Sequence, residues 1–354
     1  MRYTPRLDQQ ANPTRRRAPS HRALLWAALL TLYVVWGSTY LGIKIAVDSI
    51  PPFLMAAIRF AIAGAILLAW SIAREGRGFT WPTPRQWRDS LIVGGLLLGG
   101  GMGMVAVGEQ TVPSGIAALL IAMMPVWVAI FGRVFIGERL PRIAVLGIVI
   151  GFVGVAILAG PSAVGAADAR DPVGLGAIIL SPISWAAGSL FASHRAVLPP
   201  RPLVATGVQM LAGALVLIAL GALSGEYATF RVEDVTNDSL LALAYLTFIG
   251  SLVAFTAYVW LLRVAPLPLI ATYAYVNPVV ALILGALVLS EPISPRVIVA
   301  GAIIIFAVAL IVTARGRMRP PVPRGDPRPV GDQAPTTGDA EPLPASGRPA
   351  ATQG

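Results

Sequence analysis

The sequence predicts an all-α polytopic membrane protein of ten transmembrane helices, arranged as two five-helix repeats of inverted topology. Three observations lead to this fold class. Of 354 residues, 56% are hydrophobic and 12% charged, whereas a soluble chain carries about 25% charged residues. The apolar residues fall in ten runs long enough to cross a bilayer as helices. One residue pattern also occurs twice along the chain.

The ten predicted spans cover residues 23–46, 51–72, 90–110, 113–135, 142–159, 174–197, 203–224, 239–262, 267–289 and 296–313. The first span follows an Arg-rich segment, but it is longer than the apolar core of a signal peptide, so we expect it to be retained. Residues 1–22 and the Pro-rich residues 314–354 carry few large apolar side chains. They cannot bury enough apolar surface to offset the entropy of ordering, so we expect both to be disordered.

The arginines predict the orientation, because cytoplasmic loops carry the excess of basic residues. With the amino terminus inside, 21 of the 27 basic residues lie in cytoplasmic segments and three in outer loops. Both termini are therefore predicted to be cytoplasmic, with loops 47–50, 160–173 and 225–238 outside. The net charge of +10 then reflects topology and not nucleic-acid binding. The expected partners are membrane lipid and a small-molecule substrate. The sequence leaves open whether the protein forms a homodimer.

The repeated pattern is clearest in spans 4 and 9. Residues 125–138 read PVWVAIFGRVFIGE, and residues 277–292 read NPVVALILGALVLSEP. Three residues recur at an offset of 153: Pro125, Gly132 and Glu138 match Pro278, Gly285 and Glu291. We therefore expect two repeats, at 23–159 and 174–313. Because each has five spans, an odd number, the second must enter the membrane upside down, as in secondary transporters that move around a midplane site.

Pro125 and Pro278 lie near the midpoints of spans 4 and 9. Proline removes a helical hydrogen bond. One interpretation is a packing kink, because proline is common in membrane helices. Their paired occurrence favours the other, a helix break whose freed carbonyls face a cavity. Asn277, which can donate and accept, corresponds to Met124, so we expect an asymmetric cavity lining.

Six side chains are candidates for lining a substrate path: Trp36, Tyr40, Arg59, Trp185, Tyr273 and Asn277. Trp36 and Tyr40 are four residues apart, so they share one helix face, and Trp185 aligns with Trp36 in the repeat. Packing is the alternative role for such an aromatic stripe.

Arg59 lies too deep in span 2 to face lipid, so it needs a cavity or a partner. No Asp or Glu lies near the middle of any span, and Glu109, at the outer end of span 3, is the nearest candidate partner. Backbone carbonyls or an anionic group of the substrate are the alternatives. The repeat counterpart of Arg59 is the neutral Gln209.

Glu138 and Glu291 end spans 4 and 9 at opposite membrane faces. Interfacial anchoring is the expected role of each, and a matched pair of gates is the alternative.

Several function classes have little support in the sequence. There is no cysteine, and the two histidines are far apart, so a metal site is not expected. No Gly-x-x-x-x-Gly-Lys or HExxH motif is present, which argues against ATP-driven pumping and against a hydrolase. We therefore expect no enzyme activity and no cofactor.

The sequence resembles a known family. Residues 36–68, WGSTYLGIKIAVDSIPPFLMAAIRFAIAGAILL, are similar to the first EamA domain of the drug/metabolite transporter superfamily. PSGIAALLIAMMPVWVAIFGRVFIGERL and TYAYVNPVVALILGALVLSEPIS resemble the closing halves of its two domains. The resemblance covers nearly all of 23–313.

This resemblance implies a ten-span inner-membrane carrier, and many relatives export amino acids or other small metabolites. On this basis we expect a secondary transporter that exports small metabolites by alternating access, with amino acids or other carboxylated solutes as candidate cargo. A channel-like or facilitative permease without ion coupling is the alternative.

Overall fold

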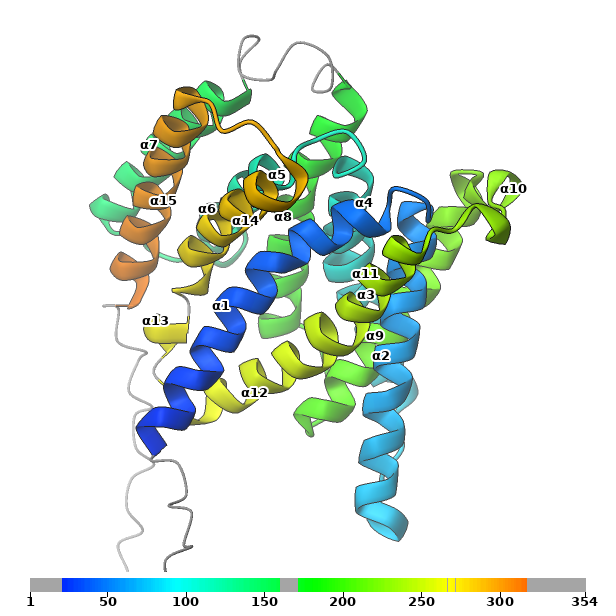
Figure 1. Ribbon diagram of the computed structural model, residues 1–354. Coiled ribbons are helices and arrows are strands. Elements are labelled where there is room, and N and C mark those ends of the chain that lie inside the picture. Colours follow the sequence, from blue (N-terminus) through cyan, green and yellow to red (C-terminus); the bar gives the residue numbers. More distant parts are fainter. Residues whose placement is uncertain (1–20, 160–170, 266, 271, 317–354) are drawn as a thin grey trace, which may run out of the picture. The chain divides into compact units, whose positions relative to one another are not determined.

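The computed structural model describes residues 21–159, 171–265, 267–270 and 272–316, and their regular structure is entirely helical (Figure 1). Nearly all of the two predicted disordered segments, 1–22 and 314–354, lies outside the described residues, as does most of the loop 160–173.

The first half of the chain forms five helical lines, each of which is a single helix or a run of consecutive helices. They are α1 (His21–Ala46), α2 (Pro52–Glu75), the composite of α3 (Pro84–Gly94), η2 (Gly95–Gly103) and α4 (Met104–Gly108), the composite of α5 (Ser114–Ile121), α6 (Met124–Phe131) and η3 (Gly132–Ile136), and α7 (Arg142–Ala159).

The second half repeats this order. Its lines are α8 (Pro172–His194), α9 (Pro202–Leu223), the composite of α11 (Asn237–Tyr245), η6 (Leu246–Val253) and α12 (Ala254–Val264), the pair α13 (Leu267–Ile270) and α14 (Tyr273–Leu289), and α15 (Pro295–Gly316). A short helix, α10 (Glu226–Thr229), lies in the loop after α9.

Eight helical segments of the described chain are long and apolar enough to cross a membrane. Two more apolar helices, at Arg142–Leu158 and Tyr273–Leu289, are shorter. The protein is therefore an all-helical, multi-pass membrane protein.

The helices begin where the sequence supplies proline or a capping side chain. Prolines occupy the first turn of α2, α3, α8 and α9, where the missing N–H costs nothing. Thr83 and Gln86 form a capping box at α3, and Asp171 accepts the N–H groups of Val173 and Gly174 at α8. These residues place the helix starts close to those expected from hydropathy.

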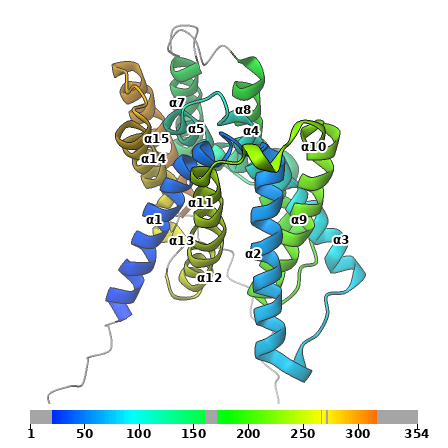
Figure 2. The same ribbon diagram turned by 45° about the vertical axis from the view of Figure 1, so that its right-hand side comes forward.

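The start of α2 is capped from the other half of the chain. The carboxylate of Glu226, in α10, accepts the N–H groups of Phe53 and Leu54 at 3.1 and 3.0 Å. Figure 2 shows α10 beside the beginning of α2. The contact satisfies two of the N–H groups that a helix start leaves without partners.

Of the three π-helical segments in the described chain, η2 and η6 lie in the middle of their helical lines, whereas η3 ends its line. Such wide turns are uncommon and often occur at functional sites. They lie at equivalent places in the two halves, because residues 95–103 correspond to residues 248–256 at the offset of 153.

Helices of the two halves pack against each other. α2 packs along α9 and α7 along α15, while α1 contacts α14 and α8 contacts α5 and α6 (Figures 1 and 2). At the α2–α9 crossing, a Cβ atom on Gly64 would lie 2.9 Å from the carbonyl oxygen of Gly207, so glycine permits the close approach. The largest buried apolar cluster includes Ile43, Val105 and Ala122, which also line the cavity described below.

Candidate functional site

A cavity of about 300 Å³ lies between the two halves, walled by α1, α2, η2, α4, α5, α6, α8, η6, α12 and α14. The structure places all six predicted path residues on its wall: Trp36, Tyr40, Arg59, Trp185, Tyr273 and Asn277. Pro125 and Pro278 also line it, whereas Glu138 and Glu291 do not.

One wall is aromatic. The Trp36 ring lies 5.0 Å from that of Tyr273 and 5.3 Å from that of Tyr258, measured between centroids. Phe255 completes the cluster at 6.1 Å from Trp36. The pairs of Trp36 with Tyr273 and Phe255 are edge-on, and such pairs stabilise one another beyond the area that they bury, so these rings join α1, α12 and α14.

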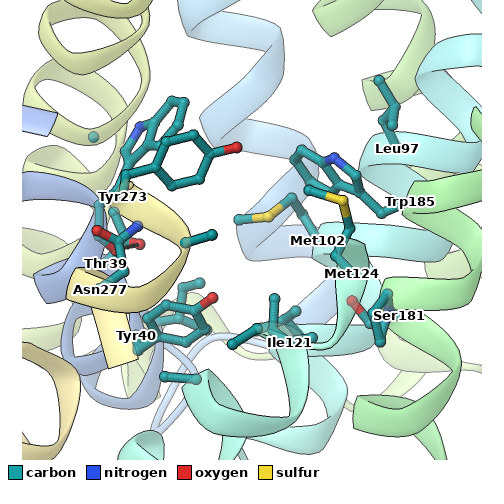
Figure 3. Close-up of a pocket in the computed structure, with 18 of the residues that line it drawn as sticks. Thr39, Tyr40, Leu97, Met102, Ile121, Met124, Ser181, Trp185, Tyr273 and Asn277 are labelled. Carbon is teal, nitrogen blue, oxygen red and sulfur yellow. Dashed lines mark hydrogen bonds between the residues drawn. The ribbon is translucent and has the colours of Figure 1, made fainter. Parts of the chain in front are cut away.

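The opposite wall is largely apolar. Figure 3 shows Leu97, Met102, Met124 and Trp185 across the cavity from Tyr273, Thr39 and Asn277. Trp185 rests on η2, because a Cβ atom on Gly101 would lie 2.7 Å from its ring. The cavity therefore offers one apolar side and one side with more polar atoms.

Several polar atoms on the wall are not used within the protein. The hydroxyl groups of Tyr40, Tyr258 and Tyr273 and the indole N–H groups of Trp36 and Trp185 make no hydrogen bond to any described residue. A polar group in a low-dielectric site favours a hydrogen-bonding partner. These five groups are therefore available to a bound molecule.

Arg59 brings a positive charge to the cavity. Its side chain is only 4% exposed. Its Nε donates to the Ser251 hydroxyl at 2.8 Å, and its guanidinium carbon lies 4.9 Å from the centre of the Phe60 ring. Neither ion pair found among the described residues involves Arg59, so its charge is not neutralised by a carboxylate there.

Glu109, the nearest acidic candidate for Arg59, is fully buried at 0% exposure. Both of its carboxylate oxygens lack a hydrogen-bond partner within the described part of the chain. It therefore forms no salt bridge with Arg59. Among the alternatives drawn from the sequence, an anionic group of the substrate gains weight.

Asn277 has a structural contact as well as a place on the wall. With the amide oriented to satisfy its surroundings, its nitrogen donates to the carbonyls of Tyr33 and Tyr273 at 3.3 and 3.2 Å. The side chain thus links α1 to α14 and is 7% exposed.

The two prolines differ in their effect on the helix. α5 ends at Ile121 and α6 begins at Met124, so Pro125 lies in the first turn of a new helix. The break predicted at Pro278 is wrong, because α14 runs through it from Tyr273 to Leu289. Pro278 lies early in α14, where it removes a single interior hydrogen bond.

Proline nevertheless has one common consequence in both halves. A residue without an N–H cannot donate to the carbonyl four positions earlier. For Pro125 and Pro278 these carbonyls belong to Ile121 and Ala274, and both residues line the cavity.

The repeated glycine and glutamate form the same turn twice. The N–H of Glu138 donates to the Gly132 carbonyl at 3.0 Å, and that of Glu291 donates to the Gly285 carbonyl at 3.1 Å. The residue before each glutamate is left-handed, with φ 77° at Gly137 and φ 54° at Ser290.

Glu291 also binds another helix. Its carboxylate accepts the N–H and hydroxyl of Ser114 at 2.8 and 2.9 Å, and the N–H of Gly115 at 3.3 Å. It thereby caps the start of α5 and ties the α14–α15 turn to the first half.

The lining is paired across the halves at the offset of 153. The pairs are Leu97 with Gly250, Leu98 with Ser251, Met102 with Phe255, Val105 with Tyr258, Ile121 with Ala274, Met124 with Asn277 and Pro125 with Pro278. The first five pairs were missed from the sequence. A signal existed, because Ser251, Phe255 and Tyr258 follow helical spacing on one face.

The described residues contain no group of three or more His, Cys, Asp or Glu side chains that could hold a metal ion. The lining of the cavity supplies aromatic rings, hydroxyl groups and one guanidinium.

Comparison with known proteins identifies similar chains. The sequence pattern of the EamA-like transporter family matches residues 22–160 and 172–313. An uncharacterized inner membrane transporter of Escherichia coli (strain K12), YedA, is 38% identical over 292 residues, covering 82% of this chain and 91% of its own. A probable amino-acid metabolite efflux pump of Salmonella typhimurium (strain LT2) is 27% identical over 299 residues, covering 78% and 91%.

One crystal structure of a protein shares the fold, with a TM-score of 0.56 and 24% identity, covering 82% of this chain and 97% of that one.

Proposed function

Because the chain belongs to the EamA-like transporter family, which makes it a membrane transporter, we propose that it is a secondary transporter that exports small carboxylated metabolites by alternating access. The observation that carries the cargo class is the unpaired guanidinium of Arg59 on the cavity wall.

The architecture that we propose has ten spans in two inverted repeats, at 23–159 and 174–313. The family pattern matches once in each repeat. The π-helical segments, the turns before Glu138 and Glu291, and seven pairs of lining residues recur at one offset. The shorter α7 and α14 fall near the lower limit of about 17 residues for a membrane-spanning helix.

The helix packing fits a pseudo-twofold relation between these repeats. Exchanging each helical line for its counterpart converts the α1–α14 contact into the contact of α8 with α5 and α6. The α2–α9 and α7–α15 contacts convert into themselves. A cavity on such an axis is where inverted-repeat carriers bind their cargo.

A cationic side chain in this setting favours an anionic ligand. A permanent charge inside a membrane protein faces a cavity or pairs with an opposite charge. The described residues supply Arg59 with a hydroxyl and a ring but with no carboxylate. A cargo carboxylate would complete the pair, and its bidentate hydrogen bonds with a guanidinium are among the strong ones.

The rest of the cavity suggests the remainder of the cargo. Leu97, Met102 and Met124 suit an apolar part, while the free hydroxyl groups of Tyr40 and Tyr258 suit a polar substituent. Amino acids and related acids combine these features. The name of the Salmonella relative, a probable amino-acid metabolite efflux pump, supports both this cargo class and the outward direction.

The test compares metabolites exported by cells that express the wild type or Arg59→Gln. We expect carboxylated solutes to accumulate outside with the wild type and at least about tenfold more slowly with the variant, because a charged hydrogen-bonded pair contributes about 1.5–3 kcal/mol. Arg74→Gln is the matched control, since Arg74 is exposed at the end of the same helix. Equal export by Arg59→Gln, at equal protein levels, would show that Arg59 is structural.

A further inference from the structure

Glu109 is a buried acid that the proposed function does not use. It directly follows α4, and a Cβ atom on the preceding Gly108 would collide with Ile178 of α8. The glycine therefore lets α8 lie against this turn, and the carboxyl group is enclosed at 0% exposure. Neither carboxylate oxygen has a hydrogen-bond partner within the described part of the chain.

Charged groups surround Glu109 without pairing with it. The charges that act on it are Lys44 of α1, Glu291 after α14 and Arg59 of α2. The Lys44 ammonium donates to the Gln110 carbonyl at 3.2 Å. On the α8 side, Asp171 accepts from the Thr111 hydroxyl at 3.2 Å.

The site also lies within electrostatic reach of the cavity. Tyr40 lines the cavity, and the charge of Glu109 acts on its hydroxyl. No hydrogen bond joins this hydroxyl to the Glu109 carboxyl group, so the enclosed acid is linked to the cavity through charge.

The chemistry of the enclosure favours the neutral acid. A carboxylate removed from water and given no hydrogen bonds is strongly disfavoured, so it takes up a proton. An ionised Glu109 would also place a negative charge in the field of Arg59 and weaken its attraction for an anion. Protonation removes that competing charge.

We propose that Glu109 is a proton-binding site that is coupled to the cargo site, so that a proton on Glu109 and a carboxylate on Arg59 bind together. The inference rests on the proposed function. Because coupling between two ligands is reciprocal, the cargo anion strengthens proton binding as much as the proton strengthens anion binding. At a pH where the cargo-free carboxyl group is ionised, the proton comes from water, and it returns to water when the anion leaves.

The first experiment needs no cargo. Infrared spectra of the purified full chain in detergent should show the C=O stretch of a protonated carboxylic acid at neutral pH. Glu109→Gln should remove this band, and Glu233→Gln, at an exposed position, should keep it. If the Gln variant does not fold, Glu109→Asp should shift the band. A spectrum in which neither variant changes a protonated-acid band would overturn the proposal.

The second experiment uses benzoate as the probe and benzamide as its neutral counterpart. At a pH high enough to remove the protonated-acid band from the cargo-free wild type, benzoate binding should take up protons, measured with an indicator dye in weak buffer, whereas benzamide should not. As pH rises, wild-type affinity for benzoate should fall by roughly 5- to 150-fold, the usual range of coupling between sites. Glu109→Gln should bind benzoate without proton uptake and with little pH dependence.

The outcomes separate the two proposals. Benzoate binding that is lost in Arg59→Gln but takes up no proton in the wild type would leave the proposed function standing and overturn the coupling. If the wild type does not bind benzoate at any pH, the carboxylate site and its coupling are both wrong.

Discussion

Ser290 holds a backbone conformation that suits glycine. Its φ of 54° and ψ of 31° lie in the left-handed region, and its counterpart in the first half, Gly137, has φ 77°. A side chain in this region costs about 1–2 kcal/mol. Both residues are exposed, so the two positions differ mainly in whether a Cβ atom is present.

We predict that Ser290→Gly stabilises the protein by about 0.5–1 kcal/mol. The relief of strain exceeds the entropy of about 0.4–1 kcal/mol that glycine adds to the unfolded chain. Denaturation by sodium dodecyl sulfate in mixed micelles would measure this change in stability. Gly137→Ser is the control and should destabilise, because its φ of 77° disfavours a side chain; nothing lies within 4 Å of the added Cβ atom, so the loss reports backbone strain and no steric clash. Equal midpoints for Ser290→Gly and the wild type would contradict the strain argument.

Single residues also show how far a sequence predicts this site. Trp36, Tyr40, Arg59 and Trp185 could be placed on a cavity, because polar or aromatic side chains deep in apolar helices need an interior position. The burial of Glu109 could not be predicted. It stands at the end of a span, beside Gln110 and Thr111, as an interfacial residue would. Its burial depends on the contact of Gly108 with α8, which no local pattern reveals.

At the scale of the elements, the position of the proline predicted the helix break in span 4 more closely than the helix break in span 9. α5 and α6 separate directly before Pro125, whereas the second line separates between Ile270 and Tyr273, before Pro278. Proline removes a single hydrogen bond, so neighbouring helices decide whether the chain bends or breaks. The Asn277 contacts to Tyr33 and Tyr273 help to hold the start of α14 in place.

The short helix α5 depends on Glu291, and we predict that Glu291→Ala destabilises the protein by about 1–2 kcal/mol. The variant removes a cap whose carboxylate accepts three hydrogen bonds from Ser114 and Gly115, and such caps contribute about this much. Thermal unfolding in detergent would measure the loss, with Glu233→Ala in an exposed loop as the control.

The same variant separates the anchor role of Glu291 from the gate role. An anchor predicts lower stability with transport reduced in proportion to folded protein. A gate predicts that transport changes while the unfolding temperature stays at the wild-type value.

For the whole molecule, hydropathy predicted a helix over each of the ten spans, because the bilayer's thickness selects the length of the apolar runs. It could not predict how the lines pair, since the α2–α9 and α7–α15 contacts join residues far apart in sequence. α7 and α14 are shorter than the eight long apolar segments, so their crossing is the part of the ten-span arrangement to test.

The absence of cysteine allows a direct test of both crossings, because any introduced cysteine is unique. Ten spans place five helical lines between Gly78 and Val232, so cysteines at these exposed positions should lie on opposite sides of the membrane. If α7 did not cross, four lines would intervene and both would lie on one side. A cysteine at Ile293 should share the side of Val232 only if α14 crosses, because the η6 line and α14 are the two that separate them.

We predict that a membrane-impermeant maleimide, applied to intact cells, labels Val232→Cys and Ile293→Cys but not Gly78→Cys or Arg139→Cys. The excess of arginine in the segments around residues 78 and 139 keeps these on the cytoplasmic side. Permeabilised cells are the control, in which all four should react. Labelling of Gly78→Cys together with Val232→Cys would reject the inverted repeat, because the two halves would then enter the membrane in the same orientation. Labelling of only Gly78→Cys and Arg139→Cys would keep the repeat and reverse the assigned orientation.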